Sequence, residues 1–412
     1  MNPELENIEA DGELLDLLSG KRAALSLNRR TLEFELPVGV FSSHEVDRGT
    51  LMLLRELEKA GAPQGAWLDA GCGCGPIALA ALANGWAERA AGLERDALAL
   101  DFARRNARSN GLVNAEWIGG VAYPEGLGRF DSIATNLPAK AGDDVHRLIL
   151  LGAAKFLKPE GRAWCVVVAP LGELIAATLH EPGVELLHVR ESAEYWVMQY
   201  RFKRAPEVSG RPYDRLEGWF DLRGASYFLR TAYGLEEFDR PSFETQLLAE
   251  LFEKGGGLET ESVAIADGGP GHLAAWCATV CSQLKTLCLV SRDALALRQS
   301  CENLSRAEFS GEVRALHSVD FSIGARDGCD WLLMRLNEKE GIGAALWRLR
   351  RCLADGAAKR VALVCNSGFG GRLEKALRRE GMHIPRKKKS KGLWGAVLVS
   401  KSFQDCSTSM LN

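Results

Sequence analysis

The stretch LDAGCGCGP, at residues 68–76, decides the fold of this chain. It follows the strand-like run GAWLDAG (65–71) and opens the helical pattern PIALAALANGWAERA (76–90). Glycines at such a junction let the backbone approach a ligand and expose helix N-terminal amides to it. In sheets whose strands alternate with helices, ligands bind beyond the carboxyl ends of the strands. The stretch therefore predicts a ligand-binding α/β domain.

Strand-like and helical segments continue to alternate after the glycine-rich stretch. The further segments are the strand AAGLE (90–94), the helix DALALDFARRNARSNG (96–111), and the strands FDSIATN (130–136), AWCVVVA (163–169) and YWVMQYRF (195–202). Such alternation implies right-handed crossovers and a mostly parallel sheet with helices on both faces. The predicted fold class is α/β, doubly wound and Rossmann-like.

Composition places the 412-residue chain among ordinary soluble proteins, with 46% hydrophobic and 25% charged residues. Its apolar runs are too short to cross a membrane, and its acidic N-terminus does not resemble a secretion signal. The 11 cysteines lie mostly in apolar segments, which predicts reduced thiols and a cytoplasmic location. A net charge of −3 gives no global support for nucleic-acid binding, although a local basic patch is compatible with it.

The chain repeats itself at nearly constant spacing. RDALAL occurs at 95–100 and at 292–297, GVFSSHEVDRGTLMLLREL (39–57) aligns with GLEEFDRPSFETQLLAELF (234–252), FDSIATNLPAKAG (130–142) aligns with CDWLLMRLNEKEG (329–341), and Asn106 aligns with Asn303. Collinear matches of this kind predict a tandem duplication. With a boundary near APEVSG (205–210), the prediction is two doubly wound domains, residues 1–205 and 206–412.

The glycine pattern distinguishes between cofactors. A dinucleotide fingerprint would need glycine at 76, where the chain has proline, and the pattern is D-x-G-x-G-x-G instead. It resembles the first motif of class I S-adenosylmethionine (SAM)-dependent methyltransferases. The predicted cofactor residues are Asp69, for the methionine ammonium, the glycines Gly71, Gly73 and Gly75, and Glu94, which ends the next strand and can accept hydrogen bonds from both ribose hydroxyls.

Simpler interpretations of the same residues remain open. The glycines could form only a tight strand–helix connection, and either carboxylate could be a solvated loop residue. Cys72 and Cys74 alternate with the glycines, but no further ligands at fitting spacing accompany them. They are therefore expected to be packing residues, and no metal site is expected.

The stretch NLPA (136–139) ends a later strand and resembles the N-P-P-aromatic motif of methyltransferases that act on exocyclic amino groups. In that family the Asn side-chain carbonyl and the next backbone carbonyl hold the target amine. The resemblance makes Asn136, Leu137 and Pro138 the candidate catalytic residues. The alternative is a polar turn after a strand, where Asn and Pro are common.

Residues 31–204 as a whole resemble the bacterial 16S and 23S ribosomal RNA guanine-N2 methyltransferases. The stretches that match are GVFSSHEVDRGTLMLL (39–54), LDAGCGCGPIALA (68–80), FDSIATNLPAKAG (130–142) and FLKPEGRAWCVVV (156–168). The resemblance implies SAM-dependent methylation of guanine N2 in ribosomal RNA, with Thr50 near the cofactor. Those enzymes also carry two methyltransferase-like domains, of which the first is degenerate.

Three positions depart from the family pattern. Leu137 replaces a proline, and Ala139 replaces an aromatic residue that could have stacked on a base. Gly119 and Gly120 stand where relatives often have an acid that contacts adenine. If the substrate is a base, the stacking ring would have to come from another residue, and the candidates are Phe41, Tyr123 and Tyr195.

The second half keeps the scaffold pattern and loses the chemistry. Gly73 and Gly75 align with Gly269 and Gly271, whereas the other positions change: Asp69 to Ile265, Gly71 to Asp267, Glu94 to Ser291, Asn136 to Arg335 and Pro138 to Asn337. This half is therefore predicted not to bind SAM and to serve as a structural or RNA-recognition domain. Its basic run PRKKKSKG (385–392) is expected to be a loop, either merely solvated or binding RNA phosphates through Lys387, Lys388 and Lys389.

The sequence thus favours an RNA methyltransferase that modifies an exocyclic base amine. Two other hypotheses remain. One is a methyltransferase of a protein side chain or small molecule, which the acidic net charge and Ala139 favour. The other is a non-catalytic scaffold that binds SAM or RNA, against which stand the intact Asp69, Glu94 and Asn136. The sequence does not address the oligomeric state.

Overall fold

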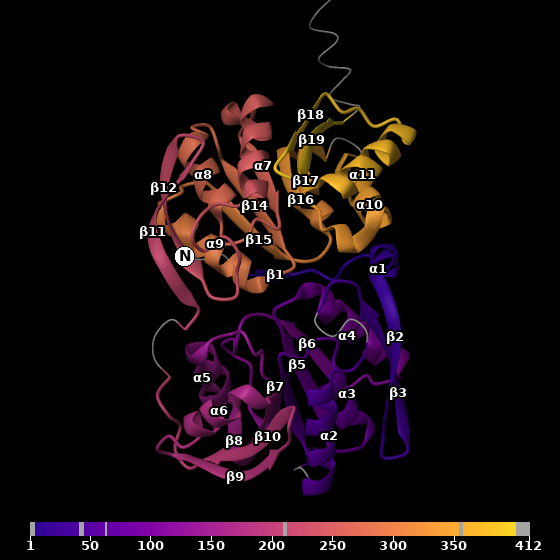
Figure 1. The fold of residues 1–412 in the computed structure, drawn as a ribbon, viewed down its shortest axis with the longest axis vertical. Helices are drawn as coiled ribbons and strands as arrows, with labels where there is room; N and C mark the ends of the chain where they lie inside the picture. Colours follow the sequence, from indigo (N-terminus) through magenta and orange to yellow (C-terminus); the bar gives the residue numbers. More distant parts are fainter. Residues whose placement is uncertain (1–4, 41–44, 62–63, 209–211, 354–356, 401–412) are drawn as a thin grey trace, which may run out of the picture. The chain divides into compact units, whose positions relative to one another are not determined.

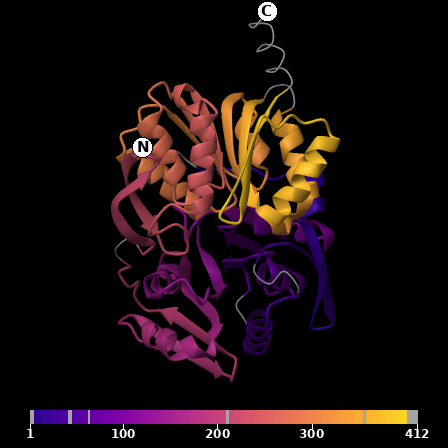
Figure 2. The ribbon, with the colours of Figure 1, turned by 45° about the horizontal axis from the view of Figure 1, so that its top comes forward.

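The computed structural model describes residues 5–40, 45–61, 64–208, 212–353 and 357–400 of the chain. These residues form two compact units. The first unit is Ser19–Tyr213, and the second unit combines Met1–Leu18 with Asp214–Asn412. Each unit contains one large sheet with helices packed on it (Figures 1 and 2).

The first unit is built on a seven-stranded sheet in the order β6-β5-β4-β7-β8-β10-β9. Its strands are β4 (Ala66–Ala70), β5 (Arg89–Glu94), β6 (Ala115–Gly119), β7 (Phe130–Asn136), β8 (Leu157–Val168), β9 (Val184–Glu191) and β10 (Tyr195–Phe202), and β2 (Ser19–Leu27) and β3 (Arg30–Pro37) form a separate hairpin. Its helices are α2 (Arg48–Ala60), α3 (Pro76–Ala83), α4 (Ala97–Ser109), α5 (Asp143–Gly152) and α6 (Gly172–Thr178), with short 3-10 turns η1 (Ala153–Lys155) and η2 (Ala169–Leu171). The strands of the seven-stranded sheet pair in parallel except β10, which is antiparallel to both of its neighbours, β8 and β9.

Local signals explain where these elements begin. All five residues of β4 are buried, as expected for a central strand covered on both faces. Asp47 and Asp96 cap α2 and α4 by accepting hydrogen bonds from Thr50 N and Leu98 N. Proline at the first position of α3 fits a helix start because its missing N–H would have no intrahelical partner there.

The second unit repeats this plan on an eight-stranded sheet in the order β1-β15-β14-β13-β16-β17-β19-β18. Its strands are β1 (Leu5–Asn7), β13 (Ser262–Ala266), β14 (Thr286–Ser291), β15 (Glu312–His317), β16 (Cys329–Arg335), β17 (Ala358–Asn366), β18 (Arg386–Ser390) and β19 (Leu393–Val399), with a hairpin of β11 (Asp214–Leu222) and β12 (Ala225–Ala232). Its helices are α1 (Gly12–Leu18), α7 (Phe243–Lys254), α8 (His272–Val280), α9 (Ala294–Arg306), α10 (Gly341–Leu353) and α11 (Ser367–Arg379), with 3-10 turns η3 (Gly257–Glu259), η4 (Phe321–Ala325) and η5 (Glu338–Glu340).

The two units share one topology once β1 is set aside. Strand for strand, the order β15-β14-β13-β16-β17-β19-β18 reproduces the order of the first sheet. The two RDALAL runs start the same helix, since Asp293 caps α9 through Leu295 N as Asp96 caps α4. The predicted fold class, two doubly wound α/β domains, is confirmed.

A buried asparagine occupies the same place in both units. The side chain of Asn106 bonds the backbone N–H and C=O of Glu35 in β3 and the carbonyl of Cys74 in the glycine turn. Asn303 bonds Arg230 N and O in β12 and the carbonyl of Pro270 in the same way. Each asparagine therefore ties the hairpin of its unit to its glycine turn.

The boundaries of the units differ from the predicted division into residues 1–205 and 206–412. β1 adds a parallel strand to the outer edge of β15, and α1 buries Leu14, Leu15 and Leu18. The Trp347 indole N–H donates to Glu13 in α1 at 3.0 Å. The first 18 residues therefore belong with the second unit, and the division falls at Tyr213. An amphipathic pattern in α1 does not reveal that the helix packs on α10, far away in the sequence.

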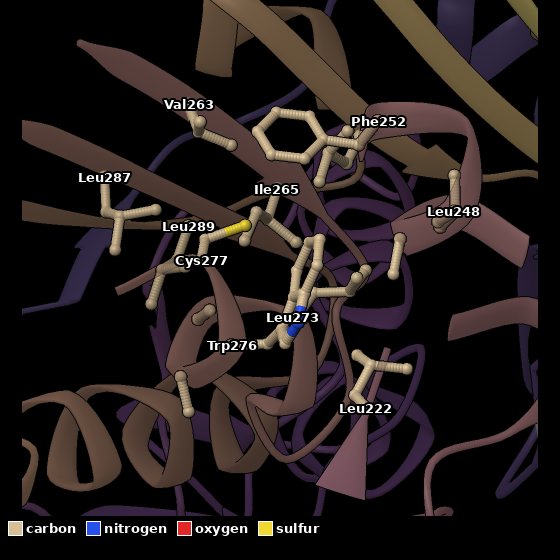
Figure 3. Close-up of a cluster of buried hydrophobic side chains, with 14 of the residues drawn as sticks. Leu222, Leu248, Phe252, Val263, Ile265, Leu273, Trp276, Cys277, Leu287 and Leu289 are labelled. Carbon is tan, nitrogen blue, oxygen red and sulfur yellow. The ribbon is translucent and has the colours of Figure 1, made fainter. Parts of the chain in front are cut away.

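One face of the second sheet packs on a cluster of apolar side chains from α7, α8 and the strands (Figure 3). Ile265, at the position of Asp69, is 1% exposed and lies within this cluster. The basic run near the C-terminus is not the predicted loop. Arg386–Ser390 form the edge strand β18, which pairs with β19, because a strand can keep its basic side chains in solvent at the edge of a sheet. No helix in the described part of the chain is long and apolar enough to span a membrane.

Candidate active site

The glycine-rich turn connects β4 to α3 through three residues that need glycine. Gly71, Gly73 and Gly75 have φ values of 79°, 53° and 89°, in the left-handed region. A side chain at Gly75 would also place its Cβ 2.6 Å from the ring of Trp117. The turn is held to the end of β5 because Gly71 N–H donates to the carbonyl of Leu93 at 2.8 Å.

Asp69 is a buried carboxylate with one oxygen left over. It is 1% exposed, and its Oδ2 accepts a hydrogen bond from Ala78 N–H at 3.0 Å. Its Oδ1 has no hydrogen-bond partner among the described residues. Burial, reinforced by the nearby charge of Glu94, raises the pKa of Asp69 to about 7. A buried oxygen of this kind calls for a donor from a ligand, and a cationic amine fits it.

Glu94 braces the glycine turn from the end of β5. One of its oxygens accepts hydrogen bonds from Arg95 N–H and Asp96 N–H at 2.8 and 2.9 Å, and the other accepts from Gly73 N–H at 2.9 Å. Burial raises the pKa of Glu94. The structure thus brings together Asp69, the three glycines and Glu94, the residues that the sequence predicts to hold a cofactor.

Asn136 lies at the end of β7, the strand next to β4. Its side-chain N–H₂ donates to Asp47 Oδ2 at 2.8 Å and to Thr50 Oγ1 at 3.0 Å. The same Asp47 oxygen caps α2 by accepting from Thr50 N–H at 3.1 Å. These contacts fix the orientation of the amide, so that its carbonyl oxygen faces away from Asp47. Thr50, which the sequence predicts near the cofactor, contacts Asn136 in this structure.

The two residues after Asn136 are held firmly as well. Leu137 is 4% exposed, and its N–H donates to Val166 O at 2.9 Å. The carbonyl of Pro138 accepts from the His146 ring at 2.9 Å and from Ala141 N–H at 3.1 Å. Asn136 is joined to the cofactor turn through its neighbour Thr135, whose hydroxyl donates to Ala70 O at 2.7 Å.

The candidate aromatic residues separate in the structure. Tyr123 donates its hydroxyl to Ile149 O and stacks on Phe156, so its ring is already engaged. Tyr195 instead lies against Gly49 in the first turn of α2, where an added Cβ would sit 2.9 Å from its ring. Burial and the neighbouring carboxylate of Asp47 raise the pKa of Tyr195. Phe41 lies outside the described residues.

Sequence reasoning missed two of the residues that organise this site. Asp47 lies within a quoted motif, and its cap spacing, Asp followed three residues later by Thr, could have drawn attention to it. Trp117 fills the space beside Gly75 and Gly92, which no local pattern indicates. Gly119 is the last residue of β6 and pairs with Glu94 of β5. The N–H of Gly120 donates to the backbone carbonyl of Glu94 at 2.9 Å.

Comparison with known proteins places this geometry in a family. The methyltransferase small domain family matches residues 31–199. The protein YbxB of Bacillus subtilis is 30% identical over 177 residues, which cover 42% of this chain and 87% of YbxB. The chain belongs to the methyltransferase small domain family. It is a SAM-dependent methyltransferase, as its glycine turn and carboxylates predict.

Two further relatives extend the comparison. The ribosomal RNA small subunit methyltransferase C of Alcanivorax borkumensis is 32% identical over 134 residues, covering 31% of this chain and 40% of that protein. The match thus spans less than half of that relative. The T. thermophilus 16S rRNA N2 guanine methyltransferase RsmC, solved with AdoMet and guanosine, superposes with a TM-score of 0.62 at 17% identity over 92% of this chain and 98% of that one. That likeness confirms the fold over both units.

The second unit of this methyltransferase fills the positions of its lost site with its own side chains. Arg335, which replaces Asn136, donates to Glu237 at 2.8 Å and also to Thr245, the counterpart of Thr50. Burial alone would raise the pKa of Glu237, but the charges of Arg335 and His272 hold it at about 2. An internal ion pair thus occupies the position of the amide.

The counterpart of the cofactor turn in the second unit is nearly closed. The space around Gly269, Gly271 and Ser291 amounts to about 10 Å³, roughly the room for one water molecule. Ser291 Oγ bonds Asp267 at 3.1 Å and accepts from Asp293 N–H at 3.0 Å, where Glu94 has its carboxylate in the first unit. With Ile265 in the apolar core and Ser291 at the end of β14, neither position equivalent to Asp69 or Glu94 carries an acid.

The cysteines beside the glycine turn are buried packing residues. Cys72 and Cys74 are 3% and 7% exposed, and both are free thiols. A side chain at Gly92 would meet the sulfur of Cys72 at 2.8 Å, which shows how tightly the sulfur fills its space. Within the described ranges, no group of three or more His, Cys, Asp or Glu side chains could hold a metal ion.

Proposed function

We propose that this methyltransferase transfers a methyl group from SAM to an exocyclic base amine, guanine N2 of ribosomal RNA. The observation that carries the proposal is the orientation of Asn136, whose amide is held by Asp47 and Thr50 at 2.8 and 3.0 Å. Its strand end lies beside the cofactor turn, because β7 pairs with β4 through Ala134 and Asp69.

The first unit has acceptors for two parts of the cofactor. Asp69 Oδ1 would accept from the methionine ammonium, and Glu94 would accept from the ribose hydroxyls. The left-handed glycines bring the backbone close to the ligand. SAM supplies an electrophilic methyl group, so the residues of this chain need only hold the acceptor in line with it.

The acceptor amine needs orientation more than it needs a base. The nitrogen lone pair of guanine N2 is delocalised into the ring, which makes it a poor nucleophile. Carbonyl acceptors from Asn136 and Leu137 favour the pyramidal nitrogen whose lone pair faces the methyl group. They bind more strongly as positive charge develops on nitrogen, so they stabilise the transition state more than the bound substrate.

Tyr195 is the residue that we assign to stacking on the base. It compensates for Ala139, which stands where the related motif has an aromatic residue. Its ring packs on Gly49, and Asp47 accepts a hydrogen bond from the Asn136 amide. The start of α2 therefore positions both the aromatic ring and the amide that would bind the amine. Base stacking on an aromatic ring commonly contributes about 1–3 kcal/mol.

The relatives support RNA as the substrate class. The A. borkumensis ribosomal RNA small subunit methyltransferase C is 32% identical to this chain over a segment that covers 31% of the chain. The resemblance to guanine-N2 enzymes rests on the stretches 39–54, 68–80, 130–142 and 156–168. We accordingly place the protein in the cytoplasm, with ribosomal RNA.

The test is a comparison of ribosomal RNA from strains with and without the protein by mass spectrometry. One methylated guanine should disappear in the deletion strain and return with the wild-type gene. Asn136→Ala should fail to restore it, with turnover lowered about 10²–10³-fold, by analogy with loss of one transition-state hydrogen bond. SAM affinity should stay nearly unchanged. If a methylated adenine disappears instead, the amine class stands and the guanine assignment is wrong.

A protein side chain or small molecule is the second candidate substrate, and Ala139 is the observation that favours it. A site without the aromatic residue of the motif suits a non-planar amine. Loss of a methyl group from a ribosomal protein or metabolite in the deletion strain, with unchanged RNA, would select this candidate. A chain that binds SAM and methylates nothing in either pool would be a scaffold.

A further inference from the structure

The second unit contains a surface groove of about 370 Å³. Three segments line it: the β11–β12 turn with Asp221, Leu222 and Arg223, the first turns of α7 with Phe243, Gln246, Leu247 and Glu250, and the end of β18 with Ser390 and Lys391. We call this cavity the α7 groove. Figure 2 shows the β18–β19 hairpin beside α7, where it forms one wall.

The α7 groove combines an apolar floor with an exposed aromatic wall. Leu222 and Leu247 are 3% and 4% exposed, and they belong to the core of the unit. Phe243 is 47% exposed, so part of its ring is open to a ligand. The ammonium group of Lys391 lies 3.7 Å from the centre of its ring. The aligned position in the first unit carries Arg48, which forms an ion pair with Glu194 at 3.6 Å.

The acids around the groove already have partners. Glu250 accepts from Lys254 and Lys388 at 2.8 and 2.7 Å, and these hydrogen bonds hold its pKa at about 2. Asp221 accepts from the Ser226 hydroxyl. The charge of Glu250 is therefore offset by two lysines, whereas Asp221 keeps its negative charge at the other side of the groove.

The strand that leads into the groove, β18, is basic. The three lysines predicted to bind RNA phosphates differ in their partners. Lys388 is committed to Glu250, and Lys387 bonds Glu374 at 2.7 Å. Lys389 is exposed, and no ion pair joins it to the described residues, which is also true of Arg386 and Lys391. Lys389 pairs with Trp394, which packs on Gly370 of α11, so its side chain lies on the opposite face of the sheet from the groove. Lys391 follows the strand and is the cation at the aromatic wall.

We propose that the α7 groove binds one unpaired nucleotide of the RNA substrate, with its base against Phe243 and its phosphate near Lys391. Its volume suits a nucleotide, and a stacking ring combined with cations is the usual means of holding single-stranded RNA. The proposal rests on the proposed function, since RNA is the substrate there. It gives the degenerate unit a specific role in RNA recognition.

Photo-crosslinking tests where RNA lies on the full chain. A 4-thiouridine-substituted ribosomal RNA transcript is irradiated with the SAM-loaded protein, and the linked peptides are mapped by mass spectrometry. Crosslinks are expected in the first turns of α7 and in the turn after β18. Crosslinks confined to the first unit, or to other surfaces of the second, would overturn the proposal.

Substitutions in the groove supply the energetic test. Phe243→Ala should weaken binding of the same transcript about 5- to 100-fold, whereas Phe243→Trp should keep it. Lys391→Gln should lower the log–log salt slope by about one. The control is Trp219→Ala, which removes a 73% exposed aromatic residue of β11 that does not line the groove. It should leave binding unchanged.

The outcomes separate this proposal from the proposed function. SAM affinity should be the same in all these variants, and an unchanged unfolding transition of the second unit, followed with and without SAM, shows that they fold. If Phe243→Ala binds RNA as well as wild type while methylation persists, the groove assignment is wrong and the function stands. If the groove variants lose RNA binding and the wild-type protein methylates no base, the proposed function is wrong and the groove assignment stands. Equal loss of binding with Trp219→Ala would contradict a site specific to the groove.

Discussion

Asp69 is the residue whose surroundings make cofactor binding depend on pH. Its folded-state pKa of about 7 lies above its ordinary value of 3.8 because it is buried with one oxygen unpaired. The cofactor-free carboxyl is therefore protonated below pH 7, and its ionisation above that pH disfavours the folded state. The cofactor-free protein should lose stability as pH rises from about 4 through 7.

SAM affinity should rise with pH through the same range, because the ammonium group binds the ionised carboxylate. Affinity should be about tenfold weaker at pH 6 than at pH 8, one pH unit on either side of the Asp69 pKa. Calorimetry across this range measures it. Asp69→Asn keeps an acceptor for Ala78 N–H, so it should remove the pH dependence, weaken SAM binding and raise the melting temperature of the cofactor-free chain at pH 8. A pH dependence that survives this substitution would point to another group.

Asp47 can be tested as a positioning residue for Asn136. Asp47→Ser keeps a helix-capping oxygen for α2 but is too short to hold the Asn136 amide as Asp47 does. Turnover should fall about 10-fold or more with little change in melting temperature, by analogy with transition-state hydrogen bonds. Ser242→Ala is the matched control, since it removes the corresponding cap of α7 and should cost about 1 kcal/mol of stability without affecting turnover. Equal losses of turnover in both variants would argue against positioning.

At the scale of elements, α1 packs in the second unit, although the rest of that unit begins almost two hundred residues later in the sequence. Leu14 is fully buried and Leu17 is 43% exposed on the same helix. Leu14→Ala should destabilise the second unit by about 2–5 kcal/mol, whereas Leu17→Ala should have little effect. SAM binding at 25 °C should be unchanged in both. Thermal unfolding monitored with and without SAM distinguishes the units, since SAM stabilises only the unit that binds it.

Elements marked by local signals could be predicted, and long-range partners could not. The glycine turn, the helix starts at Asp96 and Asp293, and the strand that ends at Asn136 each follow from a few adjacent residues. The contact of Asp47 with Asn136 joins residues 89 positions apart, and no spacing rule indicates it. The basic run at β18 predicts a loop because charge favours solvent, but an edge strand satisfies the same preference.

At the scale of the whole molecule, the two units share one topology, but only the first keeps the candidate cofactor residues. The chain should bind one SAM, as measured by the stoichiometry in calorimetry. Arg335→Asn should not create a second site, because Ile265 and Ser291 still lack the carboxylates of Asp69 and Glu94. Two SAM molecules per chain, in the wild type or in this variant, would contradict the assignment of the second unit as degenerate.

The repeat in the sequence predicted the architecture but not the allocation of the chain to its units. Matches such as RDALAL identify equivalent helices regardless of what lies between them. The first 18 residues have no counterpart in the repeat, so only the structure could assign them to the second unit. The sequence likewise does not reveal that Arg335, at the position of Asn136, forms an ion pair with Glu237. Only the structure shows this contact.

The position of β1 has a consequence for how the protein is made. β1 leaves the ribosome about three hundred residues before its partner β15. At roughly 5–20 residues per second, it waits roughly 15–60 s for that partner while all of Ser19–Tyr213 is synthesised. The first unit can therefore fold while the segment that precedes it, which belongs to the second unit, is still unpaired, and the arrival of β15 ends that wait. Until then the nascent chain carries an open strand, which makes this interval the one in which a chaperone would be of most use.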